Sequence, residues 1–183
     1  MNHEIAKYSG ISLSNFNYHF PTKRKLVLSI FSYMKMNLSE RINQNINLKR
    51  ESSPLNLVKI YIEFENEFKF FYLDTYNVIS HYDFFGKELL IQVDEAILLI
   101  KNLIYVDVGK GFIRHGPGIT ERTYDDLSNQ IWLNCHFWFA QSYIRNKKDN
   151  ILTKCINACF NLLKPYLTEE GHKKYMNFIN GLK

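Results

Sequence analysis

The sequence predicts an all-α fold, in which an N-terminal helix-turn-helix region precedes a larger helical bundle. Two observations carry this prediction. Apolar residues recur every three or four positions through most of the 183-residue chain, which is the spacing of helices that bury one face. The chain also has only four prolines and eight glycines, too few for a β architecture with many turns. We expect one region over residues 1–47 and a second over residues 48–183.

Residues 3–26 are expected to form two short helices joined by a tight turn, followed by the start of a third helix. Gly10 can adopt the left-handed backbone conformation that ends the first helix. Ser12 is a suitable N-cap for a second helix that runs to about His19. Phe16 and Phe20 lie one turn apart on this helix and are expected to face the core. This order of elements predicts a helix-turn-helix that can enter a DNA groove.

Polar and basic side chains on the outer faces of the second helix are the candidate DNA contacts. Asparagine both donates and accepts hydrogen bonds, so Asn15 and Asn17 can bond base edges or phosphate oxygens. Thr22 is expected to cap the third helix, whose free amides and neighbouring Lys23 would form a phosphate site. The candidate DNA-binding residues are Ser12, Leu13, Ser14, Asn15, Asn17, Tyr18, His19 and Lys23.

Charge is distributed unevenly along the chain. The first 50 residues hold eight Lys or Arg against two Glu, whereas the other 133 hold 15 basic and 16 acidic residues. A basic end on a nearly neutral body favours a polyanionic partner. No apolar run reaches the roughly 18 uncharged residues of a membrane span, and no signal-peptide pattern is present. We therefore expect a cytoplasmic protein with no membrane partner.

The stretch IAKYSGISLSNFNYHFPTKRKL resembles the DNA-binding signature of the TetR (tetracycline repressor) family of bacterial transcriptional regulators. The shared features are an Ile-Ala pair, a Gly-Ile-Ser turn, an aromatic-His-Phe triplet, and a Lys and a Leu that open the next helix. The resemblance implies a two-domain helical homodimer, usually a repressor, that binds a palindromic operator and is released by a small-molecule effector. By position, the expected base and nearby phosphate contacts are Leu13, Ser14 and Asn15, and the expected backbone contacts are Asn17, His19 and Lys23.

Two features depart from the family pattern. Asn17 stands where most members carry a phosphate-binding tyrosine; the NYHF form, with FKFFYLD, IW and YLTEEG further on, is similar to one subgroup, so we expect a shorter contact. The family also places a helix of about fifteen residues before this motif, packed on its core. Here the motif begins almost at Met1. Either the chain starts inside a longer natural protein, which we expect, or its helix-turn-helix has lost part of its support.

The remainder of the chain is expected to form a series of amphipathic helices. Ser53 before Pro54 predicts one helix start, and Gly109-Lys110-Gly111 predicts a helix stop. Helices 123–143 and 151–163 resemble the pair that forms the four-helix dimer interface of the family; the alternative is ordinary packing within one chain. The expected helices are 22–47, 55–73, a shorter helix or turn over 75–85, 88–108, 123–143, 151–163 and a last one from Thr168 to near Gly181.

Aromatic residues on several of these helices are the candidate effector contacts, because ligand pockets combine aromatic walls with a few polar groups. The candidates are Phe68, Tyr72, Tyr76, His81, Tyr82, Trp132 and His136. The alternative for each is a place in the core. We expect no metal or cofactor, since neither histidine has a companion at metal-binding spacing. Cys135, Cys155 and Cys159 lack a CxxC and are expected to be reduced core thiols.

An enzyme is not expected, because the sequence has no GxSxG, no HExxH and no Gly-rich nucleotide loop. The second hypothesis is a helical module that binds a ligand or a protein without binding DNA.

Overall fold

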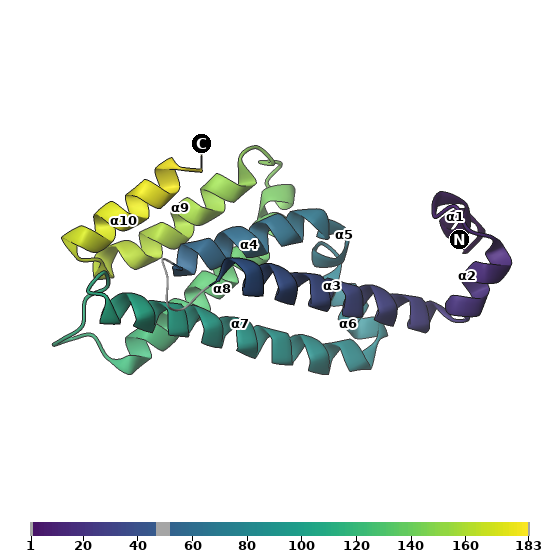
Figure 1. Cartoon of the computed structure of the whole chain (residues 1–183), viewed down its shortest axis with the longest axis horizontal. Helices are drawn as coiled ribbons and strands as arrows, with labels where there is room; N and C mark the ends of the chain where they lie inside the picture. Colours follow the sequence, from purple (N-terminus) through teal and green to yellow (C-terminus); the bar gives the residue numbers. More distant parts are fainter. Residues whose placement is uncertain (1, 47–51, 183) are drawn as a thin grey trace. The chain divides into compact units, whose positions relative to one another are not determined.

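A computed structural model describes residues 2–46 and 52–182, apart from the side chains of residues 83 and 84. The regular structure of these residues is helical, with no named strand among them, and the predicted all-α class is confirmed (Figure 1). The chain divides into two compact units, Met1–Glu40 and Arg41–Lys183. Helix α3 (Lys23–Asn45) runs across this boundary. The boundary predicted at residues 47 and 48 lies outside the described residues.

The first unit contains α1 (Asn2–Tyr8), α2 (Leu13–His19) and most of α3. Gly10 has φ of 68°, so it adopts the left-handed conformation expected for it. The Ser12 side chain accepts a 3.1 Å hydrogen bond from the backbone N–H of Asn15, which confirms the predicted N-cap of α2. The turn therefore follows the local signals in the sequence.

A small apolar centre holds α1 against α2. Ala6 and Phe16 are buried, and the rings of Phe16 and Phe20 lie 5.3 Å apart between centroids. Phe20 is the C-cap of α2, outside the helix itself, and is half-buried. The prediction that Phe16 faces the core is confirmed.

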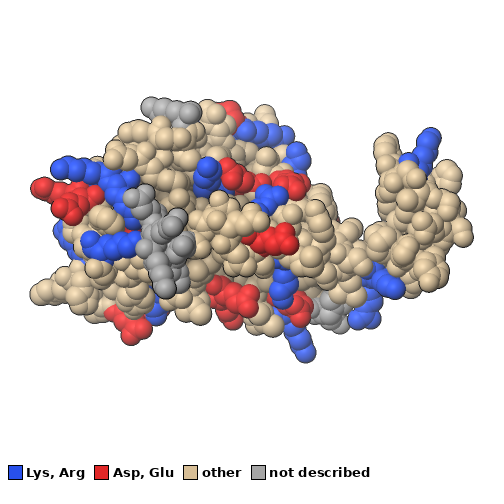
Figure 2. Space-filling model, in the orientation of Figure 1, with Lys and Arg blue, Asp and Glu red and all other residues tan. Residues whose placement is uncertain are grey.

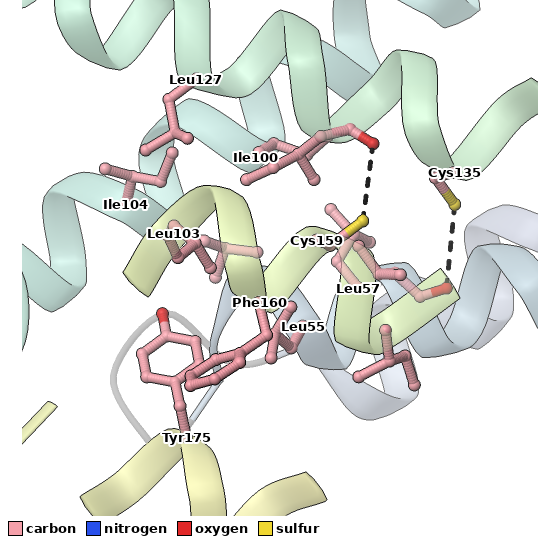
Figure 3. Close-up of a cluster of buried hydrophobic side chains, with 14 of the residues drawn as sticks. Leu55, Leu57, Ile100, Leu103, Ile104, Leu127, Cys135, Cys159, Phe160 and Tyr175 are labelled. Carbon is pink, nitrogen blue, oxygen red and sulfur yellow. Dashed lines mark hydrogen bonds between the residues drawn. The ribbon is translucent and has the colours of Figure 1, made fainter. Parts of the chain in front are cut away.

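The second unit begins with the end of α3 and is built around one hydrophobic core. α4 and α7 pack against α8, α9 packs on α4 and α8, and α10 packs on α9. Figure 3 shows side chains such as Leu57, Leu103 and Ile104 meeting in this core. The elements are α4 (Pro54–Glu67), α5 (Lys69–Tyr72), α6 (Thr75–His81), α7 (Asp83–Gly109), α8 (Glu121–Ile144), α9 (Ile151–Leu163), the short 3-10 helix η1 (Lys164–Tyr166) and α10 (Glu169–Asn180).

Several helix ends match the predicted signals. Ser53 and Asn56 form a capping box ahead of α4, with Pro54 at its first position. Gly111 has φ of 74° directly after α7, which confirms Gly109-Lys110-Gly111 as a helix stop. Thr168 caps α10 by accepting a 3.1 Å hydrogen bond from the N–H of Gly171. These boundaries could be predicted because the capping chemistry is local.

Two boundaries differ from the prediction. The helix expected over 55–73 is interrupted at Phe68, whose φ of −101° and ψ of 27° separate α4 from α5. The Phe68 ring is buried and lies 4.6 Å from the Phe64 ring between centroids. No glycine or proline marks this break, so tertiary packing decides it. Helix α7 begins at Asp83, five residues before the predicted start at Glu88.

The three cysteines are free and buried, as predicted. The thiol of Cys135 lies 3.9 Å from the carbonyl oxygen of Val58, and that of Cys159 lies 4.0 Å from the carbonyl oxygen of Ile131 (Figure 3). A hydrogen bond with Cys155, together with burial, keeps the pKa of the Cys159 thiol well above its ordinary value. The thiols are therefore packing groups of the core. Among the described helices, none has both the length and the apolarity needed to cross a membrane.

Candidate nucleic-acid interface and aromatic cluster

Helix α2 turns one side chain inward and exposes the others. Phe16 is 2% exposed, whereas Tyr18 is 81% exposed and Leu13 is also accessible. This difference arises because Phe16 belongs to the apolar centre between α1 and α2. The remaining exposed positions of the helix are Ser14, Asn15, Asn17 and His19. The sequence-predicted DNA contacts on α2 therefore lie together on one accessible surface.

Two of the predicted contacts already have partners within the unit. The Ser12 side-chain oxygen is the N-cap acceptor described above, which leaves its hydroxyl hydrogen and one acceptor lone pair for another partner. The Asn17 Oδ1 atom accepts a 3.3 Å hydrogen bond from Asn2 Nδ2, and this bond joins α1 to α2. Asn17 keeps its exposed amide nitrogen as a donor for a phosphate oxygen.

The start of α3 supplies a second polar feature. Thr22 Oγ1 accepts a 3.2 Å hydrogen bond from the N–H of Lys25, as predicted for a helix cap. Lys23, Arg24 and Lys25 are all exposed in this first turn. Free amides and positive charge at a helix start attract phosphate. In Figure 2 the drawn face of the first unit is mostly uncharged, with Lys and Arg atoms at a few separate places.

The second unit brings three of the predicted effector contacts together. The rings of Trp132 and His136, one turn apart on α8, are stacked at 4.9 Å with an interplanar angle of 14°. Tyr72 of α5 meets the His136 ring edge to face at 5.5 Å. Phe68 lies next to this group, because its ring packs on Phe64, which contacts Tyr72 at 6.2 Å. We call Tyr72, Trp132 and His136 the aromatic cluster.

The structure does not bring Tyr76 and His81 into the aromatic cluster. Tyr76 is 84% exposed on α6. His81 is also exposed, and its Nδ1 atom lies 2.8 Å from the carbonyl oxygen of Asn77 in the same helix. Tyr82 is half-buried just before α7, with its ring 5.9 Å from that of Phe85. These three candidates belong to a different part of the unit.

Glu65 is a member of this site that the sequence interpretation missed. Its side chain is 2% exposed, and Oε1 lies 3.3 Å from His136 Nδ1. Burial raises the pKa of the Glu65 carboxyl to about 7, although the hydrogen bond from His136 acts in the opposite direction. Glu65 follows Tyr61 by four positions, so it falls on the apolar face of α4. The sequence feature that could have identified this residue is an acidic side chain on an otherwise apolar helix face.

A groove of about 760 Å³ lies on α8 and α9. Its lining includes Leu133, Phe137, Trp138, Ala158 and Asn161. Leu133 and Phe137 are large apolar side chains that remain exposed within one chain. An accessible apolar surface of this kind is typical of a protein interface. It lies on the two helices for which the sequence predicted pairing between subunits.

Comparison with known proteins identifies a family and a similar fold. The TetR family model, described as a bacterial transcriptional repressor, matches residues 40–175. A solved structure with a similar fold is a TetR-family transcriptional regulator from Marinobacter aquaeolei VT8, with a TM-score of 0.82 and 17% sequence identity. That match covers 98% of this chain and 87% of the other. No curated protein sequence matches the chain.

Proposed function

The chain belongs to the TetR family of transcriptional regulators, and we propose that it is a repressor that binds a palindromic operator as a homodimer. In this proposal a small-molecule effector releases the dimer from DNA. The observation that carries it is the exposed polar face of α2, held by a capped turn and followed by a basic helix start. No cofactor takes part.

Helix α2 has the features needed to read a major groove. The groove is about 12 Å wide and accepts one α-helix, whose N-terminal residues reach the base edges. Leu13, Ser14 and Asn15 occupy that end of α2 and are exposed. Tyr18, His19 and Lys23 follow and would bind the phosphates on either side of the groove. Base contacts would set the sequence preference, and phosphate contacts would set the register.

The groove on α8 and α9 supports a dimer. Phe137 is 51% exposed there, and covering it with the same surface of a second copy would remove apolar area from water. Two copies related by a twofold axis present the same surface to each other. The symmetric pair of α2 helices would then match two half-sites about 34 Å apart.

The aromatic cluster is the proposed effector site. Tyr72, Trp132 and His136 come from two helices, so a ligand between them could change how α5 and α8 pack. A shift in this packing could alter the separation of the two α2 helices in the dimer. The proposed site leaves out Tyr76 and His81, which are exposed on α6, and Tyr82, whose ring packs on Phe85.

Selection from a random library of DNA duplexes tests the proposal without knowledge of the operator. We expect enrichment of a palindrome whose half-sites are about one helical turn apart. The selected duplex should bind more tightly than a scrambled duplex, with an affinity that falls as salt rises. If the protein enriches no sequence and binds no duplex at low salt, the second hypothesis, a helical module without DNA binding, takes its place.

A further inference from the structure

Glu65 has a carboxylate oxygen without a partner in the interior of the second unit. Oε2 is buried and has no hydrogen-bond partner among the residues that the structure describes. Its other oxygen, Oε1, faces His136 Nδ1 at 3.3 Å. A buried carboxylate oxygen without a donor is costly, because burial removes its hydration and nothing replaces it. Such an oxygen is therefore suited to accept a hydrogen bond from a ligand.

The neighbouring acidic residues of α4 differ from Glu65. Glu63 pairs with Lys59 at 3.9 Å, and Glu67 pairs with Arg41. Both of these acids are about half exposed. Within the described part of the chain, Glu65 has only the His136 ring as an ionic neighbour. Glu65, the inward-facing acidic residue of this helix, thus has, among the described residues, no Lys or Arg partner of the kind that Glu63 and Glu67 have.

Aromatic rings lie beside the same position and reach the surface, because His136 contacts both Tyr72 and Trp132. The His136 side chain is 15% exposed, and Trp132 and Tyr72 are partly exposed beside it. Ring faces attract cations through their quadrupole, and Trp is the strongest of the aromatic side chains in this respect. A ligand that enters along these rings would approach a carboxylate inside an apolar setting.

We propose that the effector is an aromatic organic cation, a protonated amine whose N–H group bonds Glu65 Oε2 while its ring packs against Trp132 and Tyr72. This inference rests on the proposed function, because it names the chemical class of ligand for the same site. The carboxylate supplies the missing countercharge, and the rings supply apolar and cation–π contact. A neutral ligand of the same shape gains the ring contact and, where it carries a hydroxyl, an uncharged hydrogen bond, but it forms no charge pair.

Three molecules of nearly equal shape test the role of charge: benzylammonium, benzyl alcohol and ethylbenzene. Binding is followed by the fluorescence of Trp132 in the full chain with Trp138→Phe, which leaves Trp132 as the single tryptophan. We expect benzylammonium to bind about tenfold more tightly than either neutral molecule, because loss of a buried charge pair is costly. Equal affinity for all three, or no binding of benzylammonium, overturns the inference.

Glu65→Gln keeps the shape of the side chain and removes its charge. It should abolish the preference for benzylammonium and leave ethylbenzene binding unchanged. The matched control is Glu63→Gln, two residues away on the exposed side of α4, which should keep the preference of the unsubstituted protein. If Glu65→Gln retains the preference, or if both variants lose it equally, the inference is wrong.

A pH series provides a measurement that needs no variant. Titratable groups close enough to Glu65 to interact with it are His136 and Cys135 on α8, Tyr61 on α4, Tyr72 on α5 and Cys155 on α9. Burial keeps the pKa values of Tyr61 and Tyr72 above their ordinary values. The thiols of Cys135 and Cys155 interact with each other by a hydrogen bond and are buried, and their pKa values are also raised, so all four groups stay neutral between about pH 6 and 8. Benzylammonium affinity should rise over this range as Glu65 ionises, whereas ethylbenzene affinity should not. A benzylammonium affinity that stays constant or falls contradicts the inference.

The outcome is separable from that of the proposed function. Glu65→Gln should select the same DNA palindrome as the unsubstituted protein, because the DNA-binding residues lie in the first unit. If DNA selection fails but benzylammonium binds specifically, the proposed repressor function is contradicted and the proposed cation site is supported. Specific DNA binding without cation preference would remove only the inference.

Discussion

The Tyr175 hydroxyl donates a 2.6 Å hydrogen bond to Oδ2 of Asp107, and both side chains are buried. Lys174 Nζ lies 2.7 Å from Oδ1 of the same carboxylate. The Asp107 carbonyl also accepts the N–H groups of Phe112 and Ile113. Asp107, near the end of α7, therefore joins that helix to the following loop and to α10. A buried carboxylate is tolerated there because both of its oxygens accept hydrogen bonds.

Replacing Tyr175 by Phe should destabilise the second unit. The change leaves Asp107 Oδ2 buried without a donor, at an expected cost of about 1–3 kcal/mol in the free energy of unfolding. Chemical denaturation followed by circular dichroism measures it. The control is Tyr105→Phe, since Tyr105 lies partly exposed on the same helix as Asp107 and should cost less than about 0.5 kcal/mol. Equal losses for both variants would show that the Asp107 contact contributes nothing particular.

Gly171→Ala should destabilise the contact between α10 and the loop after α7. A Cβ atom at Gly171 would overlap the backbone carbonyl of Phe112, which cannot rotate away as a side chain could. Overpacking of this kind costs about 1–3 kcal/mol or more. Gly109→Ala is the control, because a Cβ there meets no atom within 4 Å. Thermal denaturation should show a clearly lower melting temperature for Gly171→Ala than for Gly109→Ala. Equal melting temperatures for the two variants would contradict the close packing at Gly171.

Glu65 should make the stability of the protein fall as pH rises from about 5 to 7. Burial raises its pKa to about 7 from an ordinary value of 4.5, so in this window the folded state holds a proton that the unfolded state has lost. The resulting penalty is complete above about pH 7 and is on the order of 3 kcal/mol. Glu65→Gln should remove it.

The measurement is the free energy of unfolding of both proteins at pH 5 and pH 8. The advantage of Glu65→Gln over the unsubstituted protein should be larger at pH 8 than at pH 5. Glu63→Gln, at an exposed site, provides the control and should show no such change. A difference that is the same at both pH values would mean that Glu65 does not change its protonation on unfolding in this range.

The fold was predictable where local chemistry decides it. Gly10, Ser12 and Ser53 form a turn and two caps that depend on neighbouring backbone groups, and the structure places each as expected. The break at Phe68 was not predictable, because it depends on where the Phe64 and Phe68 rings pack.

The candidate site was predictable only in part, for a similar reason. Trp132 and His136 share one helix face and could be grouped from their spacing. Tyr72 joined them through the packing of α5 on α8, whereas Tyr76 and His81 fell on the exposed side of α6. Glu65 was not predicted, because the candidate effector contacts were chosen as aromatic residues and histidines. A buried acidic residue can be predicted from sequence only by noting that it lies on the same helix face as apolar residues.

Phe137→Glu should convert the proposed dimer into monomers. Phe137 lies in the groove on α8 and α9, and a carboxylate there would be buried against its own copy across the twofold axis. Leu98→Glu is the control, since Leu98 is 56% exposed on α7 outside the groove. Sedimentation equilibrium should show a monomer for the first variant and a dimer for the second. Dissociation by Leu98→Glu alone would place the interface on another surface.

Lys23→Ala and Asn15→Ala should weaken DNA binding in different ways. Lys23 stands at the exposed start of α3, where it would neutralise one phosphate and release about one counterion. Its loss should therefore weaken binding of the selected and the scrambled duplex alike, and reduce the slope of log affinity against log salt by about one.

Asn15 lies on the exposed N-terminal turn of α2, where it would bond a base edge. Its loss should leave the slope unchanged and relax the preference at one position of each half-site. Fluorescence anisotropy with both duplexes at several salt concentrations separates these effects, with Lys87→Ala on α7 as a control of equal charge change in the other unit. If Lys87→Ala reduces the slope as much as Lys23→Ala, net charge accounts for binding and α3 has no defined phosphate contact.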